Sequence, residues 1–213
     1  MNKRAPASPC RSPSTNRGNM AGRPKSFDTE KALEAFVDVF WTKGYQGTSV
    51  DDLQAAAGIK RGSFYAAFGC KDDVFNTVLE KYWNEATALG LNRMETETQP
   101  LKAVAGLVRH VGVFMTANTP RGCLLLTSSG ALLNEKGDGD NPVRERMKTL
   151  ERRIYSALMR ENGIRDQKTA QELTAFALAC LLGLNALARN GQDRDKILAA
   201  ANHAADCIEG NTA

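Results

Sequence analysis

The helical spacing of apolar residues restricts the fold of this chain more than any other feature. Leu33, Phe36, Val37 and Phe40 stand at i, i+3, i+4 and i+7, and similar stripes recur along most of the sequence. This spacing places apolar side chains on one face of an α-helix. The alternation of period two that marks strands is rare, while Ala and Leu are plentiful. The sequence therefore predicts an all-α fold.

Glycines, prolines and polar loops divide these stripes into about nine helices. Asp28 or Thr29 is the expected N-cap of the first helix, and residues 135–141 form a polar loop between two later ones. The expected helices cover residues 29–44, 48–58, 60–68, 71–86, 101–115, 120–133, 143–163, 168–189 and 193–208.

Charge is concentrated at the start of the chain. Residues 1–25 hold six basic side chains and no acidic one, whereas the remainder holds 22 basic and 24 acidic side chains. A basic arm on a nearly neutral body suits a polyanion such as DNA, although a solvated tail has the same composition. Because residues 1–26 are rich in Pro, Ser, Asn and Gly, we expect them to be disordered, and Met20 is an alternative start.

Several classes of protein lack support in the sequence. The five cysteines form no CxxC pair, which indicates neither a zinc site nor a disulfide framework and favours a reduced cytoplasm. No uncharged apolar stretch reaches the roughly 18 residues of a membrane span. The signatures of hydrolases, nucleotide-binding enzymes and zinc proteases are absent, so we expect no catalytic activity, no cofactor and no metal.

The most informative segment runs from residue 48 to residue 68. Two short helices are joined there by Ala57-Gly58-Ile59, and a short turn that contains Gly is typical of a helix-turn-helix. In such a unit the second helix enters the major groove of DNA. Phe64 and Phe68 would face the core, leaving basic and hydroxyl side chains outside. An ordinary corner between two helices with a solvated outer face shows the same spacing.

Residues 22–84 resemble the DNA-binding domain of the TetR family of repressors. The match includes Gly22-Arg23-Pro24, the run from Phe40 to Val50, Ala56-Ala57-Gly58-Ile59, Gly62 to Gly69, and Lys71 to Phe75. Phe64, where the family usually has Leu, and Cys70, where it has a small polar residue, depart from the pattern. The resemblance implies a dimeric repressor that binds a palindromic operator and is released by a small molecule or by thiol modification.

The resemblance also implies an organisation and a set of DNA contacts. We expect a basic arm over 1–25, a helix-turn-helix domain over 26–70, and a helical ligand-binding and dimerisation domain over 71–213. The residues expected to contact DNA are Arg23, Thr48, Ser49, Lys60, Arg61, Gly62, Ser63, Tyr65 and Lys71.

The second domain matches the family less closely. The run Arg121-Gly122-Cys123-Leu124 suggests a subgroup whose members respond to reactive molecules, metals or oxidants. Cys123 follows Arg121 in the first turn of a helix, where a thiolate is stabilised, although a small buried hydrophobic residue is the plainer interpretation. The candidate ligand contacts, each of which could also be plain core, are Trp83, His110, Phe114, Met115, Cys123, Leu125 and Tyr155.

The last two helices are candidates for a dimer interface. The helix over 168–189 is apolar nearly all round, and the helix over 193–208 carries a face of alanines. Alternatively, both complete the core of one protomer. The residues expected at the interface are Phe176, Cys180, Leu184, Leu187, Ile197, Ala201, Ala204 and Ile208.

Overall fold

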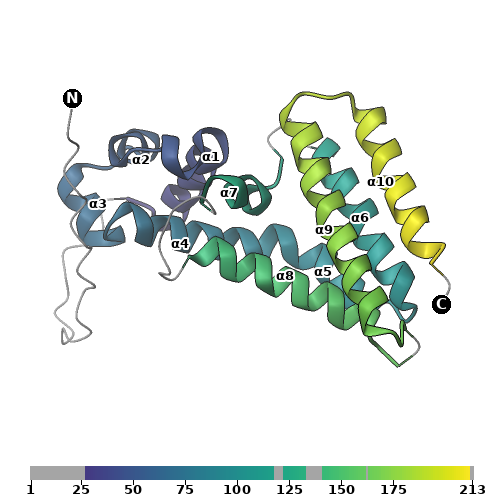
Figure 1. Ribbon diagram of the computed structural model, residues 1–213. Helices are drawn as coiled ribbons and strands as arrows, with labels where there is room; N and C mark the ends of the chain where they lie inside the picture. The colour runs from purple at the N-terminus through teal and green to yellow at the C-terminus, as the bar shows by residue number, and fades with distance from the viewer. Residues whose placement is uncertain (1–26, 118–121, 133–140, 162, 212–213) are drawn as a thin grey trace, which may run out of the picture.

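The computed structural model describes residues 27–117, 122–132, 141–161 and 163–211. Within these ranges the chain forms ten α-helices, one π-helical turn and no strand, which confirms the all-α prediction. The helices α1 to α3 gather at one end and α6, α9 and α10 at the other, with α7 between them (Figure 1). Arg23 and the rest of the predicted basic arm lie outside the described residues, as does most of the predicted polar loop.

The first three helices begin and end where local sequence signals place them. In α1 (Thr29–Gly47) Asp28 is the N-cap, and Gly44, at φ 69°, breaks the regular helix before its last residues. In α2 (Val50–Ala57) the left-handed Gly58 ends the helix, and in α3 (Arg61–Phe68) Gly69 does so. Positive φ is a conformation that glycine adopts without steric cost. Gly58 therefore shapes the turn between α2 and α3, while Gly44 and Gly69 shape the ends of α1 and α3.

The region after α3 holds one more α-helix than predicted, because the fourth helix was expected over residues 71–86 and the helical segment continues to Thr96. This segment consists of α4 (Lys71–Tyr82), the π-helical turn η1 (Trp83–Thr87) and α5 (Ala88–Thr96). The hydrogen bonds shift there to i→i+5, as π-bulges do, and such bulges are frequent at functional sites. The prediction ended this helix at residue 86, inside η1, and thus missed both the π-helical turn and α5.

The middle of the chain contributes α6 (Pro100–Ala117), α7 (Leu124–Leu132) and α8 (Pro142–Leu158). Asn141 caps α8 by accepting from the amides of Val143 and Arg144. The helix ends earlier than the predicted position near Gly163. Arg160, just after it, donates to the carbonyl groups of Met94 and Glu97 and ties the end of α8 to α5.

The helices α9 (Gln167–Arg189) and α10 (Arg194–Glu209) complete the bundle with α6. A Cβ atom at Gly112 of α6 would come within 2.4 Å of the Ala201 Cβ of α10, so small residues let these two helices pack closely. By length and composition, α9 is the one described helix that could cross a membrane. Part of it is enclosed by the rest of the bundle, and core helices pass the same test.

The packing corrects part of the predicted dimer interface. A side chain that is buried within its own chain has no surface left to contact a second protomer. For five of the predicted interface residues the alternative therefore applies, and they belong to the core of a single protomer. The five that are buried within the chain are Leu184, Ile197, Ala201, Ala204 and Ile208. Phe176, Cys180 and Leu187 keep some exposure on α9.

Candidate nucleic-acid interface and effector cavity

The start of α2 is held by a reciprocal cap. Ser49 Oγ accepts from the amide of Asp52 at 3.1 Å, and the Asp52 carboxylate accepts from the amide of Ser49 at 2.8 Å. Lys43 Nζ lies 2.5 Å from the same carboxylate. Lys43, followed by Ser49, holds the pKa of Asp52 well below its usual range, so this carboxylate stays charged. The exposed Ser49 and Lys43 are thereby fixed at one edge of the α2–α3 unit.

Thr48 is placed differently from the prediction. It is buried, and its hydroxyl donates to the carbonyl of Gly44 at 2.7 Å. The hydroxyl therefore closes the turn between α1 and α2. The Thr48 side chain is therefore not available to contact a phosphate, contrary to the prediction.

One face of α3 is polar and open to solvent. Lys60 precedes its first turn, Arg61 begins it, and Tyr65 follows with 43% of its surface exposed. Arg61 lies over the Tyr65 ring at 5.7 Å and within 4.0 Å of Asp51, and both partners of that ion pair are largely exposed. Gly62 is exposed and Ser63 partly so, and space is open around Gly62. This face offers hydrogen-bond donors and cations, the groups that contact phosphates and guanine.

The opposite face of α3 is locked into an aromatic cluster. Phe64 is fully buried, with its ring centroid 5.8 Å from that of Phe36 in an edge-to-face arrangement. Phe68 packs on Phe36 at 5.0 Å. Such ring pairs add about 0.5–1.5 kcal/mol each beyond the area that they bury. The cluster fixes the rotation of α3 and keeps its polar face outward, and the family's Leu is replaced by Phe64 without disturbing this core.

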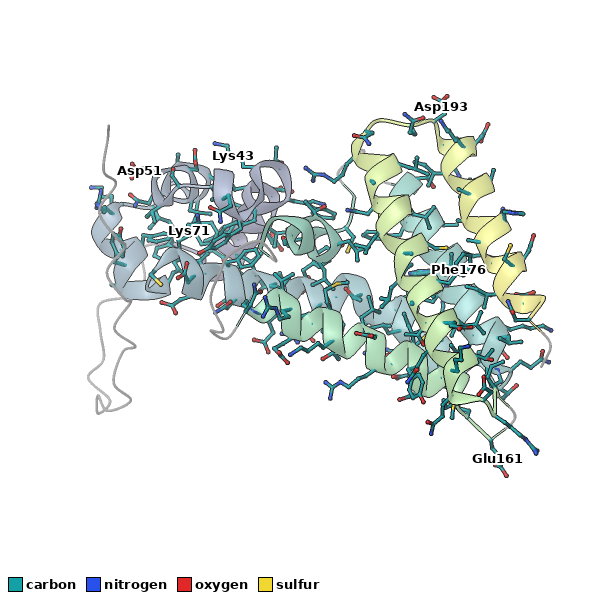
Figure 2. The ribbon with its side chains drawn as sticks, viewed as in Figure 1. Lys43, Asp51, Lys71, Glu161, Phe176 and Asp193 are labelled. Carbon is teal, nitrogen blue, oxygen red and sulfur yellow. The ribbon has the colours of Figure 1, made fainter. Side chains whose placement is uncertain are left out.

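Lys71 lies in the first turn of α4, beside α3. Its ammonium group sits 4.1 Å from the centre of the Tyr45 ring, and the Tyr45 hydroxyl donates to Asp72. Figure 2 shows Lys71 at the same end of the molecule as Lys43 and Asp51. The predicted DNA contacts from Ser49 to Lys71 thus lie at one end of the molecule.

A hydrogen bond that the sequence did not indicate joins the two ends of the molecule. Trp41 Nε1 of α1 donates to the carbonyl of Gly122, just before α7, at 2.9 Å. The Trp41 ring also meets the Tyr82 ring of α4 edge to face at 5.3 Å. Trp41 and Gly122 are 81 positions apart. No periodicity connects residues at that separation.

The same turn is bound to α9. The amide of Cys123 donates to Asn185 Oδ1 at 2.7 Å, and Asn185 is buried. Gly122 has φ 71°, and a Cβ atom there would lie 2.2 Å from the same oxygen. We name residues 122 and 123 the junction turn. It contacts α1 through Trp41, α4 through a Tyr82–Cys123 hydrogen bond, and α9 through Asn185.

The Cys123 thiol lies inside the protein. Burial raises the pKa of Cys123, and hydrogen bonds from the Tyr82 hydroxyl and from the amides of Leu126 and Leu125 only partly offset this effect. Burial likewise raises the pKa of Tyr82. The thiolate that the sequence suggested is therefore not the favoured form in this structure. The donors that would stabilise it once formed are nevertheless in place.

An apolar cavity of about 50 Å³ lies beside the junction turn. Five predicted ligand contacts line it, namely His110, Phe114, Met115, Cys123 and Leu125. Trp83 and Tyr155 do not line it: Trp83 lies beneath the guanidinium of Arg146 at 5.5 Å, and Tyr155 packs on the outside of the core from α8. Tyr82, Leu107 and Leu181 also line the cavity, although the sequence analysis named none of them as ligand contacts.

Among the described residues, no group of three or more His, Cys, Asp or Glu side chains is arranged to hold a metal ion. The far end of the molecule instead carries an apolar surface. Phe176 and Leu182 of α9 are 41% and 40% exposed, and Phe176 lies far from α1–α3 in Figure 2. We name the exposed sides of α9 and α10, which include these two residues and Cys207, the outer α9–α10 face.

Comparison with known proteins gives consistent matches. Residues 32–78 match the model for bacterial regulatory proteins of the tetR family. The chain is 28% identical over 182 residues to the HTH-type transcriptional repressor ComR of Escherichia coli strain K12, an alignment that covers 83% of this chain and 87% of ComR. It is also 28% identical over 190 residues to the repressor BdcR of the same organism, covering 88% of this chain and 92% of BdcR.

Among solved structures, the fold is similar to that of a cysteine mutant of the TetR family transcriptional regulator CifR, complexed with a 26-base-pair operator DNA. The two chains are 26% identical with a TM-score of 0.76, and the alignment covers 89% of this chain and 100% of that one.

Proposed function

We propose that this chain is a DNA-binding transcriptional regulator of the TetR family, which acts in the cytoplasm as a homodimeric repressor that a small molecule releases from a palindromic operator. The outward polar face of α3 carries this proposal, because an aromatic cluster on the other side holds it in place. Relatives named as repressors and a similar regulator bound to operator DNA support it.

On DNA, α3 would lie in the major groove. Arg61 and Ser63 are positioned to reach base edges, while Lys60, Tyr65, Ser49 and Lys71 would hold phosphates, as donors at the edges of a reading helix do. Gly62 would let the sugar-phosphate backbone approach closely. Arg23 of the basic arm would add a minor-groove contact.

We propose that the outer α9–α10 face joins two protomers. It exposes Phe176 and Leu182, with partly exposed Cys180 and Leu187 near them. Two copies related by a two-fold axis would bury these apolar side chains and place two α3 helices on successive major grooves about 34–36 Å apart. This interface replaces the one predicted from buried residues.

Release would begin in the cavity beside the junction turn. Ligand pockets usually enclose roughly 300–1,000 Å³, so a cavity of about 50 Å³ must expand to admit an effector. Tyr82 and Cys123 are among the residues that line it. Displacing them would disturb the Trp41–Gly122 hydrogen bond and the packing of α4 on α1. The two α3 helices would then leave the spacing that the operator requires.

Thiol modification at Cys123 is a second route to release. The cavity places this thiol where an entering electrophile would meet it, and Tyr82 together with two amide groups would stabilise the thiolate. Alkylation or peroxide treatment that releases the operator from the native protein but not from Cys123→Ser would support this route. Equal release from both proteins would remove it.

The function is tested by selecting the bound fragments from a library of the host genome with purified protein. We expect a short palindromic site, bound with an affinity that falls steeply with salt because counterions are released from phosphates. A binding stoichiometry of two chains per site is expected by analytical ultracentrifugation. No enriched fragment, or an affinity independent of salt, would contradict the proposal.

A further inference from the structure

A second pocket opens on the surface between α5 and α6. It encloses about 380 Å³, which falls in the range usual for small-molecule sites, whereas the inner cavity is far smaller. More charged side chains line this outer pocket than line the inner cavity beside the junction turn. The charged residues that line it are Arg93, Glu97, Lys102 and Arg109.

Apart from Arg109, the charged residues of this outer pocket carry an excess of one positive charge. Arg109 is already bound to α10, because its two terminal nitrogens lie 2.5 Å from Glu209 and 2.6 Å from Asp206. Arg93 and Lys102 remain against the single carboxylate of Glu97. The amide of Gln99, followed by weaker influences that include Lys102, lowers the pKa of Glu97, so that carboxylate is charged. A ligand with one negative charge would balance Arg93, Lys102 and Glu97 taken together.

His110 separates the outer pocket from the inner cavity and lines both. Its ring packs on α5 where only a glycine fits, since a Cβ atom at Gly90 would lie 2.7 Å from His110 Cδ2. Behind the ring the walls are apolar and include Leu107 and Met115. A rotation of one side chain would therefore connect a charged mouth to an apolar interior.

We propose that the outer pocket binds the carboxylate of an amphipathic organic acid, whose hydrocarbon chain passes His110 into the inner cavity. This inference rests on the proposed function and names the class of its effector. The Arg93 guanidinium would bind the carboxylate, with two parallel hydrogen bonds available in its fork geometry. The chain would replace the contacts of the His110 ring with apolar ones along Leu107 and Met115.

The carboxylate fits better than a phosphate monoester. A phosphate carries between one and a half and two negative charges at neutral pH and would exceed the single excess charge of Arg93, Lys102 and Glu97 taken together. A neutral alcohol of the same length would enter the apolar interior and leave Arg93 without a partner from the ligand. Comparison of an acid with its alcohol therefore isolates the outer pocket from the inner one.

The experiment measures binding of octanoate and of 1-octanol to the full-length protein without DNA, by isothermal titration calorimetry. We expect octanoate to bind about tenfold more tightly, which corresponds to about 1.4 kcal/mol. Arg93→Ala should weaken octanoate binding about tenfold and leave 1-octanol binding unchanged. Arg152→Ala removes an equal charge from the exposed side of α8 and serves as the matched control.

His110 is tested separately by stopped-flow fluorescence of the tryptophans. His110→Ala should speed the association of octanoate several-fold, because the ring no longer closes the passage. Equal affinities for the acid and the alcohol, or an Arg93→Ala protein that binds octanoate normally, would overturn the inference.

The two proposals fail in different ways. If octanoate binds with the expected pattern but leaves operator complexes intact, the result supports the outer pocket as a binding site and contradicts the proposal that a ligand there releases the operator. If the operator is bound and another compound releases it while octanoate does not bind, the outer-pocket inference alone is overturned.

Discussion

At the α3 end of the molecule an aromatic cluster holds a polar surface ready for a partner, whereas at the α6 end apolar side chains enclose a cavity of about 50 Å³. The first surface is polar, exposed and held in place by the rings behind it. The second site has to open before it can hold a ligand of ordinary size. Under the proposed function, DNA binding would use a surface that is already formed, whereas release by an effector would require work against the packing around the cavity.

The largest expected effect on stability comes from removing a ring of the aromatic cluster behind α3. Phe64→Ala should lower the free energy of unfolding by about 3–5 kcal/mol, because a fully buried ring is replaced by a methyl group. Urea unfolding followed by circular dichroism measures this loss. Tyr65→Ala, next to it but 43% exposed, is the control and should cost less than about 1 kcal/mol. Equal losses would mean that α3 is not held by this face.

Charges placed on the outer α9–α10 face should separate the protomers without affecting α1–α3. In the double variant Phe176→Arg and Leu182→Arg, two exposed apolar side chains become cations that repel those of a second copy. We expect the sedimenting mass to halve and operator affinity to fall by at least about a hundredfold, because each half-site then binds alone. Glu151→Arg on the exposed side of α8 is the control. A variant that stays dimeric would disprove this interface.

The junction turn should respond to the loss of one hydrogen bond. Trp41→Phe keeps a ring against Tyr82 but leaves the carbonyl of Gly122 without its donor, which should cost about 1 kcal/mol of stability. Hydrogen exchange at residues 122–127 should become faster. Trp83→Phe removes the same atoms elsewhere and should leave exchange at this turn unchanged. If both variants exchange alike, Trp41 does not connect the two ends.

The smallest expected effect concerns pH. Burial, followed by the charge of Arg93, lowers the pKa of His110 below its ordinary 6.5. Just below pH 6.5 the unfolded chain therefore binds more protons than the folded one, and stability falls as pH falls through this window. The melting temperature measured from pH 7.5 to 5.5 should drop less in His110→Gln than in the native protein. Parallel curves would show that His110 is as solvated as in the unfolded chain.

Local signals in the sequence predicted the helix ends of the α1–α3 region well. Asp28, Ser49 and Gly58 act within a few residues of where they stand, so the caps of α1 and α2 and the turn before α3 follow from the sequence. The spacing of Phe64 and Phe68 also correctly predicted which face of α3 is buried.

The other end depends on partners that a stripe does not identify. The alanines of α10 were assigned to a second protomer, but Gly112 of α6 lets Ala201 pack within the same chain. The shift to π-helical bonding at η1 and the helix α5 that follows it were not predicted. The Trp41–Gly122 hydrogen bond joins residues far apart in sequence, and the boundary expected after residue 70 is crossed by this bond.

The central claim is that the exposed face of α3 binds duplex DNA, and fluorescence anisotropy of a labelled operator across a salt series tests it most directly. For the double variant Lys60→Ala and Arg61→Ala, the account predicts an operator affinity at least about tenfold lower and a shallower dependence on salt, with Arg152→Ala unchanged. Native affinity and an unaltered salt dependence in that double variant would contradict the account.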